Sequence, residues 1–276
     1  MGGAIASFSA MAVAGRAVSH DHDTFELMLY RSLIGLLLVL AVSSLAGTRA
    51  SIRPGPLALH LVRNLFHFAG QNLWFFALTL VPLAQVFALE FTAPLWVLVL
   101  APVVLGERIT PPQAWAALIG FIGVLAVTRP FSAPLTPGLL AAASAAIGFA
   151  VSAIFTRRLI RTESVTSVLF WLTAMQAVFG FGAAALDGQI ALPTAAAAPW
   201  LVLIGIAGLT AHFCLTSALR LAPASTIMPV DFLRLPLIAF IGWAFYGETL
   251  DPWVATGAVL IVAGNWINLA LTPRKL

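Results

Sequence analysis

Long apolar runs, separated by short polar or Pro/Gly-rich breaks, dominate the hydropathy pattern of the chain. Each run is about the length that a helix needs to cross a bilayer. The runs are continuously apolar, whereas a transmembrane β-barrel alternates apolar and polar residues in segments of about ten. The pattern therefore predicts an all-α integral membrane protein with ten transmembrane helices. The expected helices cover residues 2–19, 27–47, 57–80, 83–105, 112–128, 138–157, 164–186, 199–220, 223–246 and 252–271.

Composition supports a bilayer location for these helices. Hydrophobic residues make up 61% of the 276 positions and charged residues only 9%, against about 25% charged in an ordinary soluble domain. Cys214 is the only cysteine, so no internal disulfide or thiolate cluster can form. The net charge is +4 and the arginines are scattered between apolar runs, unlike a nucleic-acid surface. We expect lipid and a small-molecule solute as partners, and no cofactor, metal or nucleic acid.

The basic residues predict the orientation. Membrane proteins concentrate Lys and Arg in their cytoplasmic loops. With the N-terminus in the cytoplasm, the inner loops hold Arg49, Arg53, Arg108, Arg157, Arg158, Arg161 and Arg220. We therefore expect both termini in the cytoplasm, at a bacterial inner membrane. In a nine-helix alternative, residues 2–19 lie along the interface and the N-terminus is outside.

An internal repeat becomes visible when the sequence is shifted by 141 positions. Each half then holds five helices, an odd number, so the two halves enter the membrane in opposite directions. Inverted repeats with a binding site between them are typical of alternating-access transporters. We place the halves at residues 1–134 and 135–276. The aligned pairs include Arg16 with Arg157, Pro82 with Pro223, Glu90 with Asp231, Gly106-Glu107 with Gly247-Glu248, and Pro111 with Pro252.

Two segments at this spacing, residues 81–127 and 222–264, resemble the paired repeats of EamA-type transporters of the drug/metabolite transporter superfamily. The shared signal is Gly-Glu, then Thr-Pro or Asp-Pro, then a glycine-containing helix, and the resemblance covers essentially the whole chain. It implies a secondary transporter and not an enzyme, with a cavity lined mainly by helices 1–4 and 6–9. Substrates of the family range over amino acids, nucleotide-like metabolites, vitamins and organic cations. The acids inside helices 4 and 9 depart from many relatives.

Those two acids, Glu90 and Asp231, are the strongest candidates for a binding site. A charge at the centre of a transmembrane helix costs roughly 2.5–3.5 kcal/mol on the insertion scale, so each needs a reason. One interpretation is a site for a substrate amine or a proton. The other is structural pairing, available to Asp231 because Arg234 lies one helical turn along the same face. Pro94 and Pro236 follow the acids and are either hinges or ordinary transmembrane prolines.

Polar side chains occupy one face of the third helix, at i, i+3, i+4 and i+7 spacing. Such a face cannot point at lipid, so it must line a cavity or pack within the bundle. His60 and Arg63 lie near the cytoplasmic end, where snorkelling accounts for them. His67 and Gln71 lie deeper and are expected to contact the solute or relay a proton. The complete face is His60, Arg63, Asn64, His67, Gln71 and Trp74.

Arg31 and an aromatic pair are further candidates. Arg31 could meet a substrate carboxylate, pair with Glu90, or snorkel toward the outer surface. Tyr30 and its repeat counterpart Trp171 suit a cation or an aromatic ring. Weaker polar or small-residue faces are formed by His212 with Thr216 and by Ser144, Gly148 and Ser152.

Two other motifs are interpreted as structural. Glu107 and Glu248 each precede a proline-started helix, so we expect them to hold those turns and favour the helix dipole. The run His20-Asp21-His22-Asp23 contains metal-ligand residue types, but a solvated turn is the simpler interpretation.

Small-residue faces leave the oligomeric state open. Gly120 with Gly123, and Gly257 with Gly264, could pack within one chain or between two, so both a monomer and a homodimer are compatible with the sequence.

Together these features predict a secondary active transporter. It would move a small polar, amine-bearing or aromatic metabolite by alternating access, coupled to protons or to exchange. No G-x-x-x-x-G-K-[ST] or H-E-x-x-H motif is present, but a membrane sensor or scaffold and an intramembrane enzyme stay as alternatives. The predicted binding residues are Glu90, Asp231, His67, Gln71, Arg31, Arg63, Asn64, Trp74, Arg234, Tyr30 and Trp171.

Overall fold

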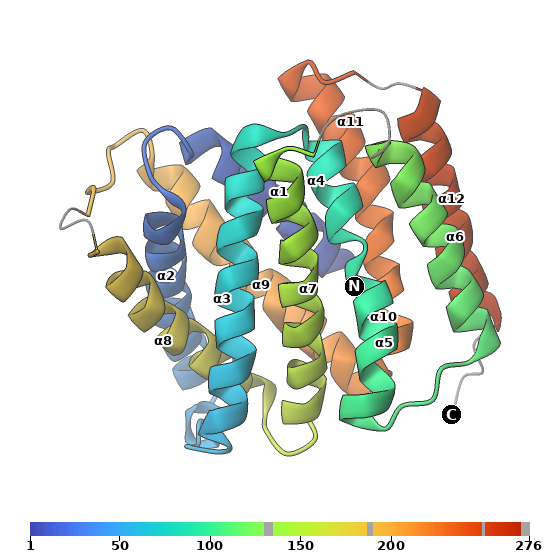
Figure 1. Cartoon of the computed structure of the whole chain (residues 1–276). Helices are drawn as coiled ribbons and strands as arrows, with labels where there is room; N and C mark the ends of the chain where they lie inside the picture. The colour runs from blue at the N-terminus through green and yellow to red at the C-terminus, as the bar shows by residue number, and fades with distance from the viewer. Residues whose placement is uncertain (130–134, 187–189, 250–251, 272–276) are drawn as a thin grey trace.

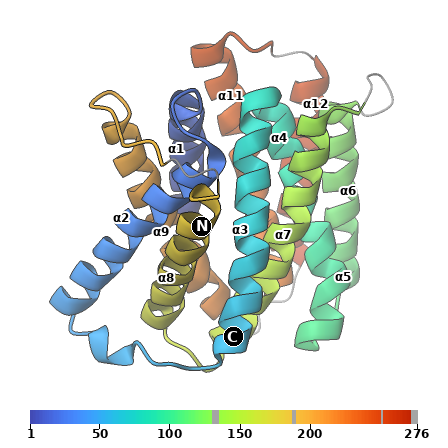
Figure 2. The same cartoon turned by 60° about the vertical axis from the view of Figure 1, so that its left-hand side comes forward.

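The computed structural model describes residues 1–129, 135–186, 190–249 and 252–271. Throughout these ranges the chain is a bundle of helices without strands (Figures 1 and 2). The first half contributes α1 (Gly2–Val18), α2 (Thr24–Leu45), the short η1 (Arg49–Ser51), α3 (Leu57–Leu80), α4 (Leu83–Glu90), α5 (Ala93–Leu105) and α6 (Pro111–Thr128). The second half contributes α7 (Pro137–Leu159), α8 (Val165–Ala184), α9 (Ala198–Leu221), α10 (Ala224–Ile227), η2 (Met228–Leu233), α11 (Arg234–Tyr246) and α12 (Pro252–Leu271).

These elements confirm the predicted fold class of ten transmembrane segments in two inverted five-helix repeats. The count is ten because α4 with α5, and α10 with η2 and α11, each form one interrupted segment. Within the described residues, five segments are long and apolar enough by themselves to cross a membrane: Thr24–Leu45, Leu83–Leu105, Pro137–Leu159, Val165–Ala184 and Ala198–Leu221. α1 is shorter, yet Met11, Ala12 and Ala14 are at most 1% exposed and the helix packs along α9. The nine-helix alternative, with this segment on the interface, is therefore wrong.

Helix ends follow the repeat. Asp23 caps α2 by accepting a hydrogen bond from Glu26 N at 2.8 Å, and Ser164, its counterpart, caps α8 by accepting from Ser167 N at 3.0 Å. Gly106 and Gly247 end α5 and α11 with φ of 68° and 65°, the left-handed conformation that glycine adopts most easily. The glycine in each Gly-Glu pair therefore turns the chain and fixes the direction of the glutamate that follows.

Two helices are broken at mid-depth, at repeat-related positions. α4 ends at Glu90 and α5 starts at Ala93, with Pro94 in its first turn. Proline has no N–H and cannot continue the helical hydrogen bonding, which explains the break. In the second half, the 3₁₀ segment η2 contains Asp231, and Pro236 lies in the first turn of α11. Pro94 and Pro236 thus mark real interruptions, while a hinge function for them stays a prediction.

Contacts between the halves follow the two-fold relation. α1 packs along α9, and its counterpart α7 packs along α3; α2 packs on α8, and α4 packs against α11. α6 and α12 pair with each other at one side of the bundle (Figure 1). The largest buried core cluster draws side chains from both halves.

The glycine faces of α6 and α12 are used within the chain. A Cβ on Gly257 would lie 2.5 Å from Gly123 O and 2.4 Å from Val127 Cγ2, and one on Gly264 would lie 2.7 Å from Ala116 O. Such close backbone approach is the usual role of small residues between membrane helices.

Replacing Gly257 with leucine is therefore expected to separate α6 from α12. Overpacking a close contact costs about 1–3 kcal/mol, and thermal unfolding of the purified protein would report the loss. Gly182→Leu is the matched control, because nothing lies within 4 Å of a Cβ at that exposed position. Equal melting temperatures for the two variants would contradict the packing described here.

Candidate functional site

A pocket of about 60 Å³ lies between the halves at the level of the two helix breaks. Its lining side chains come from α1, α3, α4, α7, α9, η2 and α11, whereas α2 and α8 supply none. The family resemblance predicted a lining from the second and seventh expected helices as well. These are α2 and α8, and neither supplies a lining residue. The lining includes Phe8, Met11, Arg63, His67, Gln71, Trp74, Glu90, Phe149, Ser152, Thr156, His212, Thr216, Met228, Asp231 and Arg234.

One arginine holds both buried acids at one side of this pocket. Arg234 donates from Nη2 to Glu90 Oε1 and to Asp231 Oδ2, each at 2.5 Å. Trp74 Nε1 donates to the second oxygen of Glu90 at 2.7 Å. The two acids that the repeat made equivalent therefore meet, one from each half, through a single guanidinium. Two carboxylates share one positive charge, so the cluster carries an excess negative charge unless it binds a proton or a cation.

Aromatic rings fix the position of that guanidinium. Arg234 Cζ lies 4.9 Å from the centre of the Phe8 ring, 4.8 Å from that of Phe87 and 5.4 Å from that of Phe91. Cation–π contacts of this kind gain strength when the cation is desolvated, and Arg234 is 1% exposed. Glu90, Asp231, Arg234 and Trp74 form what we call the acid cluster.

The polar face of α3 is buried along its whole length, as predicted. Its six members are at most 2% exposed. The expectation that His60 and Arg63 snorkel to the membrane surface is therefore wrong, because α7 and α8 cover that end of α3. Arg63 instead donates to Thr156 Oγ1 at 3.0 Å and to Asn64 Oδ1 at 2.8 Å. His67 and Gln71 line the pocket, and His67 Nε2 and Gln71 Nε2 have no hydrogen-bond partner within the described residues.

A second group of basic side chains contributes Arg63, His67 and His212 to the pocket lining. Arg31 of α2 is 3% exposed and is within electrostatic range of Arg63, His67 and His212. The imidazole centres of His67 and His212 are 4.6 Å apart. Arg31 does not pair with Glu90, one of the possibilities left by the sequence. The described residues place no carboxylate within 4.0 Å of Arg31 or Arg63.

Four predicted binding residues do not line the pocket. Arg31 lies against Gly208, and the other three make contacts with a loop or with a neighbouring helix. Tyr30 donates from its hydroxyl to Ala191 O at 2.7 Å, and Trp171, its counterpart, donates from Nε1 to Arg53 O at 2.9 Å. Asn64 Nδ2 donates to Trp171 O at 3.2 Å and so joins α3 to α8.

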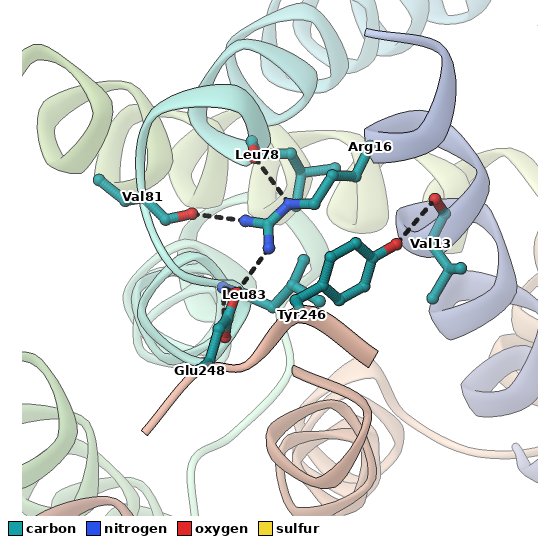
Figure 3. Close-up of polar contacts among 7 residues, drawn as sticks. All are labelled: Val13, Arg16, Leu78, Val81, Leu83, Tyr246 and Glu248. Atoms are coloured by element: carbon teal, nitrogen blue, oxygen red, sulfur yellow. Dashed lines mark hydrogen bonds and ion pairs between the residues drawn. The ribbon is translucent and has the colours of Figure 1, made fainter. Parts of the chain in front are cut away.

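An ion pair between Arg16 and Glu248 joins the two halves (Figure 3). Arg16 Nη1 donates to Glu248 Oε1 at 2.5 Å, and its other nitrogens donate to Leu78 O at 3.0 Å and Val81 O at 2.7 Å. Glu248 also accepts from Leu83 N, at 2.9 Å and 3.1 Å. We call this arrangement the upper latch, because the C-terminal ends of α1 and α11, beside which Arg16 and Glu248 lie in the sequence, are at the top of the bundle in Figure 1.

The repeat generates a counterpart at the opposite end. Arg157 Nε donates to Glu107 Oε1 at 3.3 Å, and Arg157 Nη1 donates to Leu219 O, the counterpart of Leu78 O. This lower latch is the looser of the two, because Glu107 Oε2 has no partner within the described residues. Each latch joins an arginine of one half to a glutamate of the other.

The sequence contained a signal for the latches that its interpretation missed. Arg16 aligns with Arg157, and Glu107 aligns with Glu248, at the same 141-residue offset. Glu107 and Glu248 were expected to act only in their own turns, but their side chains reach the other half. Gln113 Oε1 caps the helix instead, accepting from Thr110 N at 2.9 Å. Asp251, the repeat counterpart of Thr110, lies outside the described residues.

The acidic and histidine-rich segment 20–23 is a helix start. Asp23 caps α2, and His22 is 4% exposed with its Nδ1 3.2 Å from Glu26 Oε2. The expectation of a fully solvated turn is therefore wrong for His22, whereas His20, Asp21 and Asp23 are exposed. The described residues hold no cluster of three or more His, Cys, Asp or Glu side chains that could bind a metal.

Comparison with known proteins places this geometry in context. The family model described as "EamA-like transporter family" matches residues 2–129 and 136–270. The chain is 31% identical over 240 residues to a riboflavin transporter of Brucella anthropi, covering 86% of this chain and 84% of the relative. It is 26% identical over 258 residues to an S-adenosylmethionine uptake transporter of Rickettsia bellii, covering 94% and 88%. A pseudopaline exporter of Pseudomonas aeruginosa is 27% identical over 263 residues, covering 93% and 89%.

A solved structure shares the fold. It superposes with a TM-score of 0.79 at 22% identity, covering 98% of this chain and 94% of the other. The ten-segment bundle is thus an arrangement already observed by crystallography.

Proposed function

Because the chain belongs to the EamA-like transporter family, we propose that it moves a small metabolite across the membrane by alternating access between its two halves. The observation that carries the proposal is a pocket between two broken helices with a repeat-related latch at each end. The halves correspond to residues 1–134 and 135–276. Opening one latch at a time would expose the pocket to one side of the membrane and then to the other.

The small volume of the pocket supports a transport cycle that includes a state closed to both sides of the membrane. Sites for drug-sized ligands usually have volumes of about 300–1,000 Å³, and this pocket measures about 60 Å³. A metabolite can therefore enter only when the halves move apart. Both latches are formed, which is the arrangement expected of an occluded state.

The acid cluster favours a solute that carries an amine, or a coupled proton. Glu90 and Asp231 face the pocket with one guanidinium between them, so one positive charge is missing. A substrate ammonium group or a proton would supply it, and the rings of Phe8 and Trp74 would contact an apolar or aromatic part of the solute. His67, Gln71 and Arg63 complete the proposed binding residues from α3.

The arginine distribution supports an orientation with both termini in the cytoplasm of a bacterial inner membrane. In that orientation the upper latch faces outward and the lower latch faces the cytoplasm.

Uptake into proteoliposomes tests the function. Riboflavin and S-adenosylmethionine, named for the relatives, form the first radiolabelled panel, with and without an inward proton gradient or unlabelled solute inside. We expect the gradient or the internal solute to accelerate uptake by the wild type. Glu90→Gln leaves Arg234 paired with Asp231 alone, so this variant should still fold. The increase in its uptake rate caused by the gradient or the internal solute should be smaller by roughly tenfold or more, in line with about 1.5–3 kcal/mol for a charged hydrogen bond.

Asp21→Asn is the control, because Asp21 is exposed and lies far along the chain from the acid cluster. If Glu90→Gln and Asp231→Asn both keep the full response to the gradient and to internal solute, the acid cluster is not the coupling site.

A further inference from the structure

Two buried arginines without a counter-ion point to a second feature of the solute. Arg31 is 3% exposed and Arg63 is 2% exposed. Inside a membrane protein an arginine is normally paired with an acid or with backbone carbonyls. Here the described residues place neither an acid within 4.0 Å nor a backbone carbonyl in hydrogen-bond contact with either guanidinium.

The acids that could have served are already engaged. Glu26, on the same helix as Arg31, accepts from Ala191 N at 2.5 Å and from Asp23 N at 3.1 Å. Glu90 and Asp231 are held by Arg234. The positive charge of Arg31 and Arg63 is therefore not balanced by the protein in the part of the chain that the structure describes.

Buried nitrogen atoms without hydrogen-bond partners accompany the two arginines. Arg31 Nε, His67 Nε2 and His212 Nε2 are buried without a hydrogen-bond partner within the described residues. Arg63, His67 and His212 line the pocket directly. Arg31 lies behind them against Gly208, where a Cβ would approach Arg31 Nε to 2.6 Å. Because Gly208 has no side chain, the Arg31 guanidinium can pack against it, whereas a larger residue at position 208 would displace the guanidinium.

We propose that Arg31, Arg63, His67 and His212 form an oxyanion site that binds a carboxylate or phosphate group of the transported solute. Arginine and histidine donors suit such groups because charged hydrogen bonds to oxyanions are short and strong. The inference rests on the proposed transport function and adds a substrate class to it. The acid cluster supplies negative charge to the pocket, and the oxyanion site supplies positive charge to the same pocket. The solute that fits both is zwitterionic.

Matched probe pairs test the site on the purified full-length protein. The carboxylate pairs are L-phenylalanine with L-phenylalaninamide and L-methionine with L-methioninamide, and the phosphate pair is riboflavin 5′-phosphate with riboflavin. We expect the anionic member of at least one pair to raise the melting temperature, because a ligand that binds only the folded state stabilises it. The type of pair that responds separates carboxylate from phosphate recognition. Neutral phosphatidylcholine nanodiscs exclude an anionic lipid as the source.

Arg31→Gln and Arg63→Gln should weaken that binding by roughly 10- to 100-fold, as expected for a lost charged hydrogen bond. Arg108→Gln is the matched control for charge, since Arg108 is exposed. A structural role predicts that Arg31→Gln lowers the melting temperature of the ligand-free protein. The oxyanion site predicts the opposite, because removing an uncompensated buried charge relieves its desolvation cost.

Two outcomes overturn the inference. One is that no anionic probe raises the melting temperature of the wild type, or that Arg31→Gln lowers the melting temperature of the ligand-free protein. The other is that Arg31→Gln transports a neutral solute such as riboflavin as fast as wild type and binds anionic probes equally well; transport itself would then stand. Arginine-dependent anion binding without uptake into vesicles would instead support the oxyanion site and contradict the transport function.

Discussion

Replacing Arg234 with methionine should destabilise the protein by about 3–5 kcal/mol and abolish transport. Removing one partner of a buried ion pair has a cost of this size because the other charge stays buried and unpaired. Here two carboxylates, Glu90 and Asp231, lose their common partner at once. Three aromatic contacts, to Phe8, Phe87 and Phe91, are lost as well. Unfolding of the purified protein in mixed micelles would measure the change in free energy.

A compensated variant separates charge balance from packing. Adding Glu90→Gln and Asp231→Asn to Arg234→Met removes the unpaired charges, so most of the stability should return, since replacing a complete buried ion pair by neutral residues is often close to neutral. Transport should stay absent, because the site for an amine or proton is gone. If Arg234→Met alone unfolds like wild type, Arg234 does not provide the charge compensation for Glu90 and Asp231 described here.

The sequence predicted the helices because hydropathy and turn residues are local signals. All ten segments, both Gly-Glu turns and the buried face of α3 could be derived from spacing alone. The breaks beside Glu90 and Asp231 also had a local marker, in Pro94 and the equivalent region around Pro236.

Side-chain partners could not be predicted in the same way. Glu90 binds Arg234 across 144 positions, and Arg16 binds Glu248 across 232. A helical pattern shows which face is buried, but not which helix covers it. That is also why His60 and Arg63 were expected to snorkel, although α7 and α8 cover them. Inverted symmetry reduces the number of possible partners. If a residue of one half contacts a residue of the other, the repeat counterparts of these two residues are expected to contact each other as well. Applied to Arg16 and Glu248, it gives Arg157 and Glu107.

Removing one latch should favour the conformation in which the pocket is open to one side of the membrane. Glu248→Gln weakens a charged hydrogen bond to Arg16 and two contacts to Leu83 N, whereas Glu107→Gln weakens a single bond to Arg157. Charged hydrogen bonds contribute about 1.5–3 kcal/mol, and each 1.4 kcal/mol changes a population ratio tenfold. We therefore expect Glu248→Gln to increase the population of the state open at the upper latch by roughly 10- to 100-fold. Glu107→Gln should have a smaller effect on the population of the state open at the lower latch.

A pocket cysteine reports this opening. Met11 lines the pocket, so Met11→Cys in a Cys214→Ala background can be labelled with a membrane-impermeant maleimide added from either side. Glu248→Gln should accelerate labelling from the side of the upper latch and slow it from the other. The reason is that the populations of the occluded and the two open states sum to one, so one state gains only at the expense of the others. Glu107→Gln should do the reverse. The charge-reversed pair Arg16→Glu with Glu248→Arg should return labelling toward the starting rate. Acceleration from both sides by either variant would mean that the latches hold the bundle together without selecting between its two open states.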